Sequence, residues 1–517
     1  MTNTLRSVKA AAWTAAAVLL ATTASAQQAA PAGAQAAQAE RYVVGQAKPP
    51  EVPGSVLRNM SLEDAYAVAL ENNLDLKVAR MDPQGVDYQL QAARAAYAPR
   101  LTGSYAYNNA TRPSNDSQEG KLSVTDLSQS FNSSLSQTLP WWGSTMSATF
   151  NNNRTNTDRV NVFFPTSYSS NLSASFTLPL LANRAIDGNR NQLRTLQIQR
   201  QISDIQLESI VENTKASVRQ AYWALRQAIE QIEIQRRALE LAQRQFEDNK
   251  IRVEIGTMAR IETTTSETQV VNAELSVLNA EIGWQTAELN LKRLLASGPD
   301  DEIFRATINP VDVPTFEAPA VDPAAAAKAA LDQRLDLVQA QRSIDVSRLN
   351  LEVTKNATLP GLDLSSTYRL SGQANSYSDA LGRIKGIDNP TWTVSFNFSY
   401  PLGMKQARAN YARAQLQLDQ SLASLASQEL TVSNEVYNAG LAVNNTYRQL
   451  QGAIKASEVA QRNADAEQVR YDVGLSNPYN VALAQNTLTN ARLTELSRTI
   501  AYLNAVAEFE RVQRIGR

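Results

Sequence analysis

Two short segments of this chain alternate apolar and polar side chains without interruption, although very long helical stretches surround them. A β-strand has a side-chain period of two, so each segment has one apolar face and one polar, uncharged face. This pattern is typical of a barrel wall with lipid on one side and water on the other. The apolar positions are Trp392, Val394, Phe396, Phe398, Tyr400 and Leu402 in one segment and Leu172, Ala174, Phe176, Leu178 and Leu180 in the other.

An internal duplication organises the rest of the chain. Pro99 matches Pro360 at an offset of 261 residues, whereas Pro179 matches Pro401 at an offset of 222. The first copy therefore holds 39 additional residues. Each copy is expected to run in the same order: a helix, strands, a very long helix, a glycine break and a second helix.

The duplication sets the expected domain boundaries. They are a signal peptide (1–26), a flexible mature N-terminus (27–59), a first structural repeat (60–297, with strands at about 100–180), a Pro-rich connector (298–323) and a second structural repeat (324–517, with strands at about 361–402). The expected helices are 61–97, 184–255 and 259–296 in the first copy and 323–357, 404–473 and 476–515 in the second. The insertion adds two weaker strand candidates, at 131–139 and 145–153.

The first 26 residues have the features of an export signal. Arg6 and Lys9 precede an apolar stretch at 10–20, and a small-residue cleavage site ends at Ala26. The apolar stretch is shorter than a membrane-spanning helix requires. The sequence therefore predicts an exported protein, and any insertion into a membrane is expected to use strands.

Composition excludes several classes of chemistry. The chain has no Cys and no His, which removes disulfides, thiol nucleophiles and imidazole bases. Its net charge of −1 gives no sign of the clustered basic face of a nucleic-acid binder. Phosphate-binding, zinc-protease and hydrolase motifs are not found in the sequence. We therefore predict no catalytic residue, cofactor, metal site or nucleic-acid partner.

The long helices have coiled-coil spacing. Apolar residues recur at steps of four and three along the segment 218–232, which is the periodicity of knobs-into-holes packing. A soluble coiled-coil stalk has the same periodicity. The strands favour the membrane interpretation, because four to six strands are too few to close a barrel and lipid cannot satisfy an open sheet edge. Several protomers must then share one barrel, and a small soluble sheet capped by helices is the alternative.

The duplicated plan, with prolines at the strand entries (Pro99, Pro360) and glycines at the helix breaks (Gly256, Gly474), resembles the TolC family of outer-membrane efflux proteins. The resemblance covers about residues 60–515. It implies a mainly α fold in which a long periplasmic α-barrel continues into a membrane β-barrel shared by a homotrimer. It also implies a location in the outer membrane of a Gram-negative bacterium, extending into the periplasm. The expected partners are outer-membrane lipid, a periplasmic adaptor (membrane fusion) protein and an inner-membrane transporter.

The same resemblance assigns roles at the helix breaks. Gly256, Thr257, Gly474, Leu475 and Ser476 resemble the family's hairpin tips, which dock the adaptor. A glycine is the least strained residue where a helix ends with positive φ, and the freed helix-end groups can meet a partner. Alternatively, both glycines serve only to end their helices, as a C-cap glycine does in any antiparallel helix pair.

A periplasmic gate is expected next to these tips. In the family a tyrosine before the second glycine bonds an acid after the first, and here these positions are Tyr471 and Glu262. The family's constriction aspartates correspond to Asn480 and Leu483. Neither is acidic, which argues against a cation-binding acidic ring at that level.

The leading hypothesis is an exit duct of a tripartite efflux or type I secretion system. It would conduct passively, with energy supplied by an inner-membrane pump. A structural, adaptor-like periplasmic coiled-coil protein without membrane strands is the alternative, and an outer-membrane enzyme is a third. If the two insertion strands join the wall, a trimer has 18 strands, and if they form an outer loop, it has 12. The sequence does not identify the exported substrate.

Overall fold

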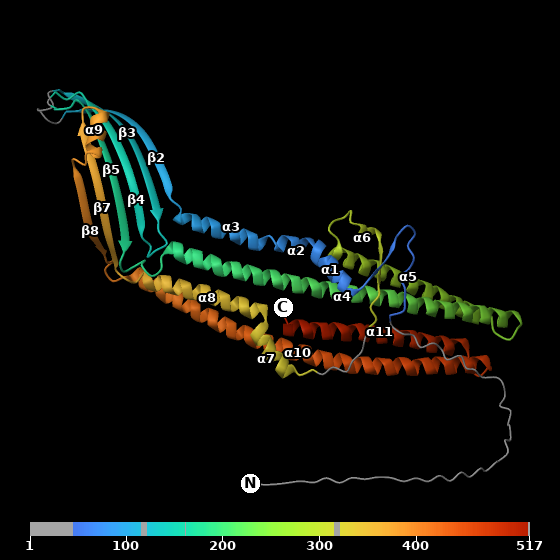
Figure 1. Ribbon diagram of the computed structural model, residues 1–517. Helices are drawn as coiled ribbons and strands as arrows, with labels where there is room; N and C mark the ends of the chain where they lie inside the picture. The colour runs from blue at the N-terminus through green and yellow to red at the C-terminus, as the bar shows by residue number, and fades with distance from the viewer. Residues whose placement is uncertain (1–44, 115–120, 161, 315–320, 515–517) are drawn as a thin grey trace, which may run out of the picture. The chain divides into compact units, whose positions relative to one another are not determined.

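The computed structural model describes residues 45–114, 121–160, 162–314 and 321–514. The expected signal peptide (1–26) and most of the expected flexible N-terminus lie outside the described residues. Long helices and one antiparallel sheet account for most of the described chain (Figure 1). None of the described helices combines the length and the apolar character needed to cross a membrane.

The helices follow the duplicated plan. In the first copy they are α1 (Leu62–Asn72), α2 (Leu74–Ala79), α3 (Asp82–Arg94), α4 (Gly188–Glu254) and α5 (Ile261–Leu295). In the second copy they are α7 (Pro323–Gln333), α8 (Leu335–Asn356), α9 (Tyr377–Lys385), α10 (Lys405–Asp472) and α11 (Pro478–Arg514). The expected uninterrupted helices 61–97 and 323–357 are wrong, because the first is broken near Asn73 and Met81 and the second at Arg334.

The breaks have side-chain causes. Asn73 leaves helical geometry, and its Oδ1 accepts a hydrogen bond from the Leu76 amide, so that it caps α2. Its Nδ2 also donates to the Leu294 carbonyl oxygen of α5 at 3.1 Å. In the second copy the Arg334 guanidinium bonds both Asp336 and Glu435, at 2.7 and 2.6 Å. These contacts hold the separate helix pieces in the bundle, and each copy therefore has shorter helices where one continuous helix was expected.

The two longest helices, α4 and α10, are the axes of the two copies. The Asp187 side chain caps α4 by accepting a hydrogen bond from the Arg190 amide. With 67 residues, α4 is about 100 Å long at 1.5 Å per residue. Its heptad positions Val218, Tyr222, Leu225, Ile229 and Ile232 are all buried, as coiled-coil spacing predicts.

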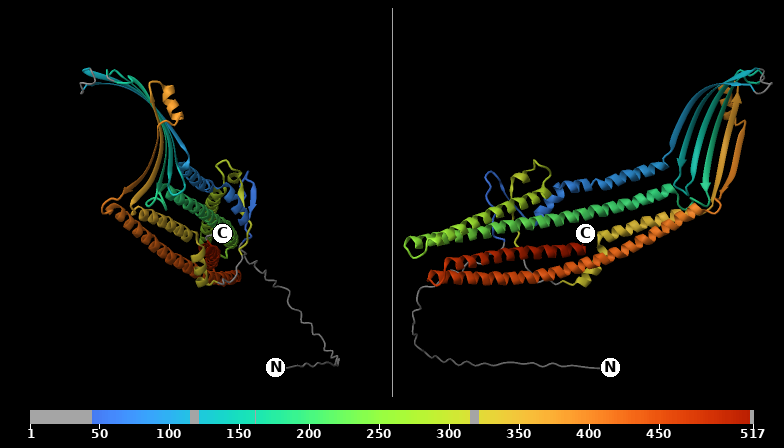
Figure 2. Two further views of the ribbon diagram at one scale, coloured as in Figure 1. Left: turned by 60° about the vertical axis from the view of Figure 1, so that its left-hand side comes forward. Right: turned by 180° about the vertical axis from the view of Figure 1, so that it is seen from behind.

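A six-stranded antiparallel sheet stands at one end of these helices, and Figure 2 shows its curvature. Its strands, in spatial order, are β2 (Arg100–Pro113), β3 (Ser123–Thr138), β4 (Thr145–Thr157), β5 (Thr166–Pro179), β7 (Gly361–Ala374) and β8 (Pro390–Ser399). The sequence repeat places strands at about 100–108, 172–180, 361–370 and 391–402, and these four and the two weaker insertion candidates are all present. The two insertion strands, β3 and β4, lie inside the sheet between β2 and β5.

Four helices continue the sheet on one side. α3 leads into β2, α4 follows β5, α8 leads into β7, and α10 follows β8 (Figure 1). The neighbouring helices follow the strand order, since α3 contacts α4, α4 contacts α8, and α8 contacts α10. The short helix α9 packs instead on β5 and β7. Gly372 permits this approach, because a Cβ there would lie 2.0 Å from the Ala380 carbonyl oxygen.

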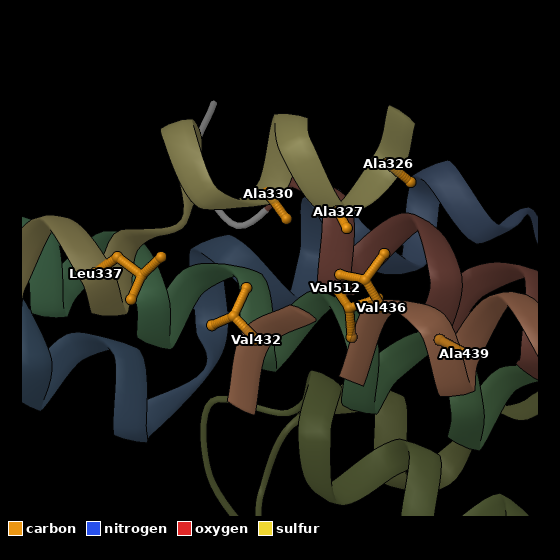
Figure 3. Packing of buried hydrophobic residues seen from close by; sticks show 8 residues of the cluster. All are labelled: Ala326, Ala327, Ala330, Leu337, Val432, Val436, Ala439 and Val512. Carbon is orange, nitrogen blue, oxygen red and sulfur yellow. The ribbon is translucent and has the colours of Figure 1, made fainter. Parts of the chain in front are cut away.

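Alanine-rich packing joins the helices of the second copy. Side chains of α7, α8, α10 and α11 meet in one apolar cluster in Figure 3. Its members are Ala326, Ala327, Ala330, Leu337, Val432, Val436, Ala439 and Val512. Small side chains let α7 lie close against α10, because an alanine side chain extends only one methyl group from the backbone.

A small parallel sheet lies beside the middle of α4. It pairs β1 (Leu57–Met60) with β6 (Thr307–Pro310), and the short helix α6 (Glu302–Arg305) precedes β6. Residues 57–59 therefore belong to a strand, which corrects the expectation of a flexible segment as far as residue 59. Strand β6 lies within the expected Pro-rich connector.

A buried ion pair on α4 ties these segments together. Arg226 and Glu230 are 2% and 0% exposed, and their side chains lie 2.7 Å apart. Arg226 Nη1 donates to the carbonyl oxygens of Ala47 and Pro310, and Glu230 Oε1 accepts from the Gly45 amide. The pair thus fastens the N-terminal segment and β6 to the long helix.

We expect Arg226→Met to lower the free energy of unfolding by about 3–5 kcal/mol, because it leaves the buried Glu230 carboxyl without its cation. Urea unfolding followed by far-UV circular dichroism measures the change. Arg244→Met is the matched control, since Arg244 pairs with Glu240 on the same helix at 70% and 59% exposure. An exposed pair contributes roughly 0–1 kcal/mol. The double variant R226M/E230M should recover most of the loss, and equal effects of R226M and R244M would contradict this role.

Candidate functional site

The six-stranded sheet has one apolar face and one polar face. Directly paired residues of antiparallel strands lie on the same face, so the register assigns each side chain. Leu364 pairs with Phe396, Leu172 with Leu370, and the insertion strands continue the row with Leu135 and Ala148. Many of these side chains are exposed in the protomer, including Trp392 at 76% and Phe398 at 68%. The protomer therefore leaves a broad apolar face uncovered by its own chain.

Hydroxyl and amide side chains fill the opposite face. Ser147 and Ser175 place their hydroxyl oxygens 2.7 Å apart, and Thr149 and Ser173 repeat the contact one pair further along the same strands. Thr177 continues this row toward β7 with a 3.3 Å contact to Ser365. Two charged residues of β7 share this face, since Asp363 pairs with Asn397 and Arg369 with Thr391. A face made mostly of hydrogen-bonding groups is easily wetted, which suits a water-filled passage.

The apolar face covers only the helix-proximal part of the strands. On β4 it runs from Met146 to Phe150 and gives way to Asn152, Arg154 and Asn156 farther from the helices. On β8 it runs from Trp392 to Phe398, about 20 Å at 3.4 Å per residue. The apolar band is therefore formed by the helix-proximal part of the sheet, and the polar far ends of the longer strands extend beyond it.

At the other end of the long helices, both hairpin turns have the same hydrogen-bond pattern. Gly256 and Gly474 have φ of +75° and +79°. The Thr257 amide donates to the Arg252 carbonyl at 2.9 Å, and the Leu475 amide donates to the Arg470 carbonyl at 2.8 Å. Both turns are therefore Schellman motifs, in which glycine takes the left-handed position. The duplication of the sequence is thus repeated in the local geometry.

The predicted tip residues are accessible. Gly256, Thr257 and Gly474 are exposed, and Leu475 is 80% exposed. Ser476 is half-buried because its hydroxyl donates to the Glu467 carboxylate. Further exposed apolar residues lie beside the two turns, namely Ile251, Ile255, Ile261, Val469, Val473 and Tyr479.

Tyr471 lies at the centre of a buried polar network between the two hairpins. It is 2% exposed, and its hydroxyl donates to Asn249 Oδ1 on α4. Gln245 Nε2 donates to the same oxygen at 2.9 Å, and Asn249 Nδ2 donates to the Ser266 hydroxyl on α5. The Ser266 hydroxyl in turn donates to the Glu262 carbonyl oxygen at 2.8 Å. These contacts link α10 to both helices of the first hairpin, and we call the five residues the tip network.

The structure modifies the expected Tyr471–Glu262 pair. The two residues share the tip network, but Glu262 takes part through its main-chain carbonyl, while Asn249 provides the acceptor for the tyrosine. Burial raises the pKa of Tyr471, against the opposing effect of Arg252, so its hydroxyl remains a donor. The Arg252 guanidinium lies 4.4 Å from the centre of the tyrosine ring.

The two positions that correspond to constriction aspartates lie on α11 and face solvent in the protomer. Asn480 is exposed, its main-chain N–H donates to Asn477 Oδ1 at 2.9 Å, and its side-chain Nδ2 donates to the Ser476 hydroxyl at 3.5 Å. Leu483 is 54% exposed. Their assignment to the gate stays a prediction.

Sequence reasoning missed Asn249, Gln245 and Ser266. A signal was present, because Gln245 and Asn249 are spaced four apart on α4 and so lie on one face of the helix. A polar pair at such positions fixes helix register when each group finds a partner. Which partner each group finds depends on the neighbouring hairpin.

Comparison with known proteins identifies the family. The model of the outer membrane efflux protein family matches residues 145–297 and 326–512, one match in each copy. The chain belongs to this family. The two matches fall on the two halves of the duplication, from β4 to the end of α5 and from α7 to α11.

The relatives of this outer membrane efflux protein include two TolC proteins. It is 24% identical over 304 residues to outer membrane protein TolC of Escherichia coli, and 29% identical over 187 residues to that of Salmonella enteritidis. These alignments cover 56% and 34% of this chain, and 59% and 36% of the two relatives. The chain thus aligns with less than two thirds of either protein.

The fold also matches a solved outer-membrane channel. The Campylobacter jejuni CmeC outer membrane channel aligns with a TM-score of 0.64 at 18% identity, covering 88% of this chain and 86% of that one. The predicted fold class, mainly α with a membrane β-barrel portion, is confirmed, and so is the TolC-like resemblance. This efflux protein is located in the outer membrane and extends into the periplasm.

We expect Tyr471→Phe to increase the frequency of channel opening, because it removes one buried hydrogen bond of about 0.5–1.5 kcal/mol between the hairpins of each protomer. Single-channel recording in planar bilayers measures the change, and about a fivefold rise corresponds to 1 kcal/mol. Tyr479→Phe makes the same chemical change at a 61% exposed position and should leave opening unaltered. If the two variants give indistinguishable recordings, the tip network does not hold the channel closed.

Proposed function

We propose that three copies of this chain form the outer-membrane exit duct of a tripartite efflux or type I secretion system. The duct conducts substrates passively from an inner-membrane pump and its adaptor. The observation that carries the proposal is the open six-stranded sheet, which has an apolar face, a hydroxyl-lined face and two unpaired edges. Family membership supports the same function.

Closure by identical copies follows from the sheet edges. Within the protomer, β2 pairs only with β3, and β8 pairs only with β7. Their outer backbone groups need partners in lipid, where no water replaces them. Repeating one chain around an axis supplies the partner of each edge from the next copy. A homotrimer is the arrangement that the resemblance to the TolC family implies.

Adaptor docking at the two hairpin tips is supported by their exposure. Both Schellman turns are exposed and are flanked by uncovered apolar side chains such as Ile255, Ile261 and Leu475. Apolar residues gathered at one surface mark a contact site for another protein. The adaptor would cover these side chains, and the tip network would hold the hairpins together until it docks.

We expect Gly474→Ala to weaken adaptor docking and leave the trimer intact. An L-residue at φ of +79° is strained by roughly 1–2 kcal/mol, so the turn should rearrange. A photo-crosslinker at Thr257, on the other hairpin, reports docking in cells as the yield of the adaptor adduct. Gly452→Ala is the control, because Gly452 lies within α10 and a Cβ there would meet no atom within 4 Å.

Two results would count against the proposed function. One is a detergent-extracted monomer in place of a heat-sensitive trimer on gel electrophoresis. The other is an undiminished crosslink yield in the Gly474→Ala variant, which would remove the tip from the docking surface. Deletion of the gene should make cells sensitive to the exported compound. Identification of the captured adaptor would indicate which pump, and so which class of compound, the duct serves.

A further inference from the structure

The insertion hairpin is an internal part of the sheet. β3 pairs along its length with β2 on one side and with β4 on the other, and β4 pairs along its length with β5. A hairpin folded out of the sheet as a loop would leave β2 and β5 as neighbours, but they do not pair. Moving the β3–β4 hairpin out of the wall would therefore break all the backbone hydrogen bonds between β2 and β3 and between β4 and β5.

The hairpin also has the amphipathic pattern of the wall. On its apolar face, Phe131 and Leu135 of β3 continue the row that Phe150 and Ala148 of β4 occupy. On its polar face, Thr149 contacts the Ser173 hydroxyl of β5. Both faces of the hairpin thus match those of β2, β5, β7 and β8, the strands present in both copies of the repeat. The hairpin can therefore lie in the membrane as those strands do.

The turn between β3 and β4 is fixed to the helical part. Ser144 is 2% exposed, and a Cβ on Gly143 would lie 2.9 Å from the Asn183 carbonyl oxygen just before α4. Gly143 has φ of +68°, so the close approach and the backbone conformation both need glycine. At the end of β3, Gln137 Nε2 donates to the Tyr97 carbonyl oxygen at 3.1 Å.

We infer that the membrane wall is an eighteen-stranded barrel, to which each of three protomers contributes six strands. This inference rests on the trimer proposed above. Strand β8 of one protomer pairs with β2 of the next. An even number of alternating strands leaves β8 and β2 running in opposite directions, so their pairing continues the antiparallel order around the ring.

The perimeter of the helical part supports this number. Six strands spaced 4.8 Å apart and tilted by 35–45° span about 35–41 Å of wall per protomer. The four helices that continue the sheet, packed 8–10 Å apart, span about 32–40 Å. The two walls therefore meet with nearly equal perimeters. Four strands would span only about 23–27 Å and would require the wall to narrow sharply at the junction.

The wider wall has a consequence for transport. Eighteen strands give a backbone diameter of about 36 Å at a tilt of 40°, whereas twelve give about 24 Å. The cross-section is then about twice as large, and barrels of this size hold an open aqueous channel. The outlet through the membrane is thus wide and lined by hydroxyl groups, and any selection by size falls to the helical tips.

Cysteine labelling tests whether the hairpin lies in the wall, because the chain has no native Cys. Ser134→Cys on the polar face should react with a membrane-impermeant maleimide in reconstituted vesicles, whereas Leu135→Cys on the apolar face should be protected at least tenfold. Ser395→Cys and Phe396→Cys form the matched pair on β8. If positions 134 and 135 were labelled equally while positions 395 and 396 on β8 still differed, the eighteen-stranded wall would be wrong and the proposed function would stand. Loss of the contrast in both pairs would overturn the proposed function.

Electron microscopy of the wild-type protein in lipid nanodiscs counts the strands directly. The expected ring has threefold symmetry and a wall of eighteen strands about 36 Å across. A threefold ring with a twelve-stranded wall would refute this inference and leave the trimeric duct standing. A ring with another number of copies would refute the trimer itself.

Discussion

Each backbone N–H and C=O group that enters the hydrocarbon region needs a protein partner, because lipid offers none. The interior strands of the sheet meet this requirement within one chain, but β2 and β8 meet it on one side only. The apolar face gives the sheet a reason to enter the membrane, and the two unpaired edges prevent one copy from staying there alone. The need for neighbouring copies follows from these two features together.

In the proposed assembly, the helical part would extend the closed barrel into a long passage. α3, α4, α8 and α10 keep the order of the strands they join, so in the proposed trimer a ring of sheets would continue as a ring of helices. The distant ends are built twice from the same turn, as expected from a duplicated sequence. Between them, the tip network holds the hairpins by neutral hydrogen bonds, which are less sensitive to pH and salt than an ion pair.

Local patterns predicted most of the elements. Period-two alternation located the strands at 172–180 and 391–402, because the alternation reflects an environment that differs on the two sides of each strand. The insertion strands were weaker candidates from the sequence, and the structure confirms both. The helix breaks at Asn73 and Arg334 were missed because each depends on a contact with another helix, through Leu294 and Glu435 respectively. Pairing of β1 with β6 was missed because four-residue strands some 250 residues apart leave no periodic signal.

The sequence alone determined the duplicated plan, the positive-φ glycines that end the long helices and the two-faced character of the wall strands, since each depends on residues close together in the chain. The tertiary structure decided that β3 and β4 lie within the sheet and that Tyr471 bonds Asn249 where an acid was expected. Both outcomes depend on which distant backbone or side chain is near enough to pair, and local spacing does not record that distance.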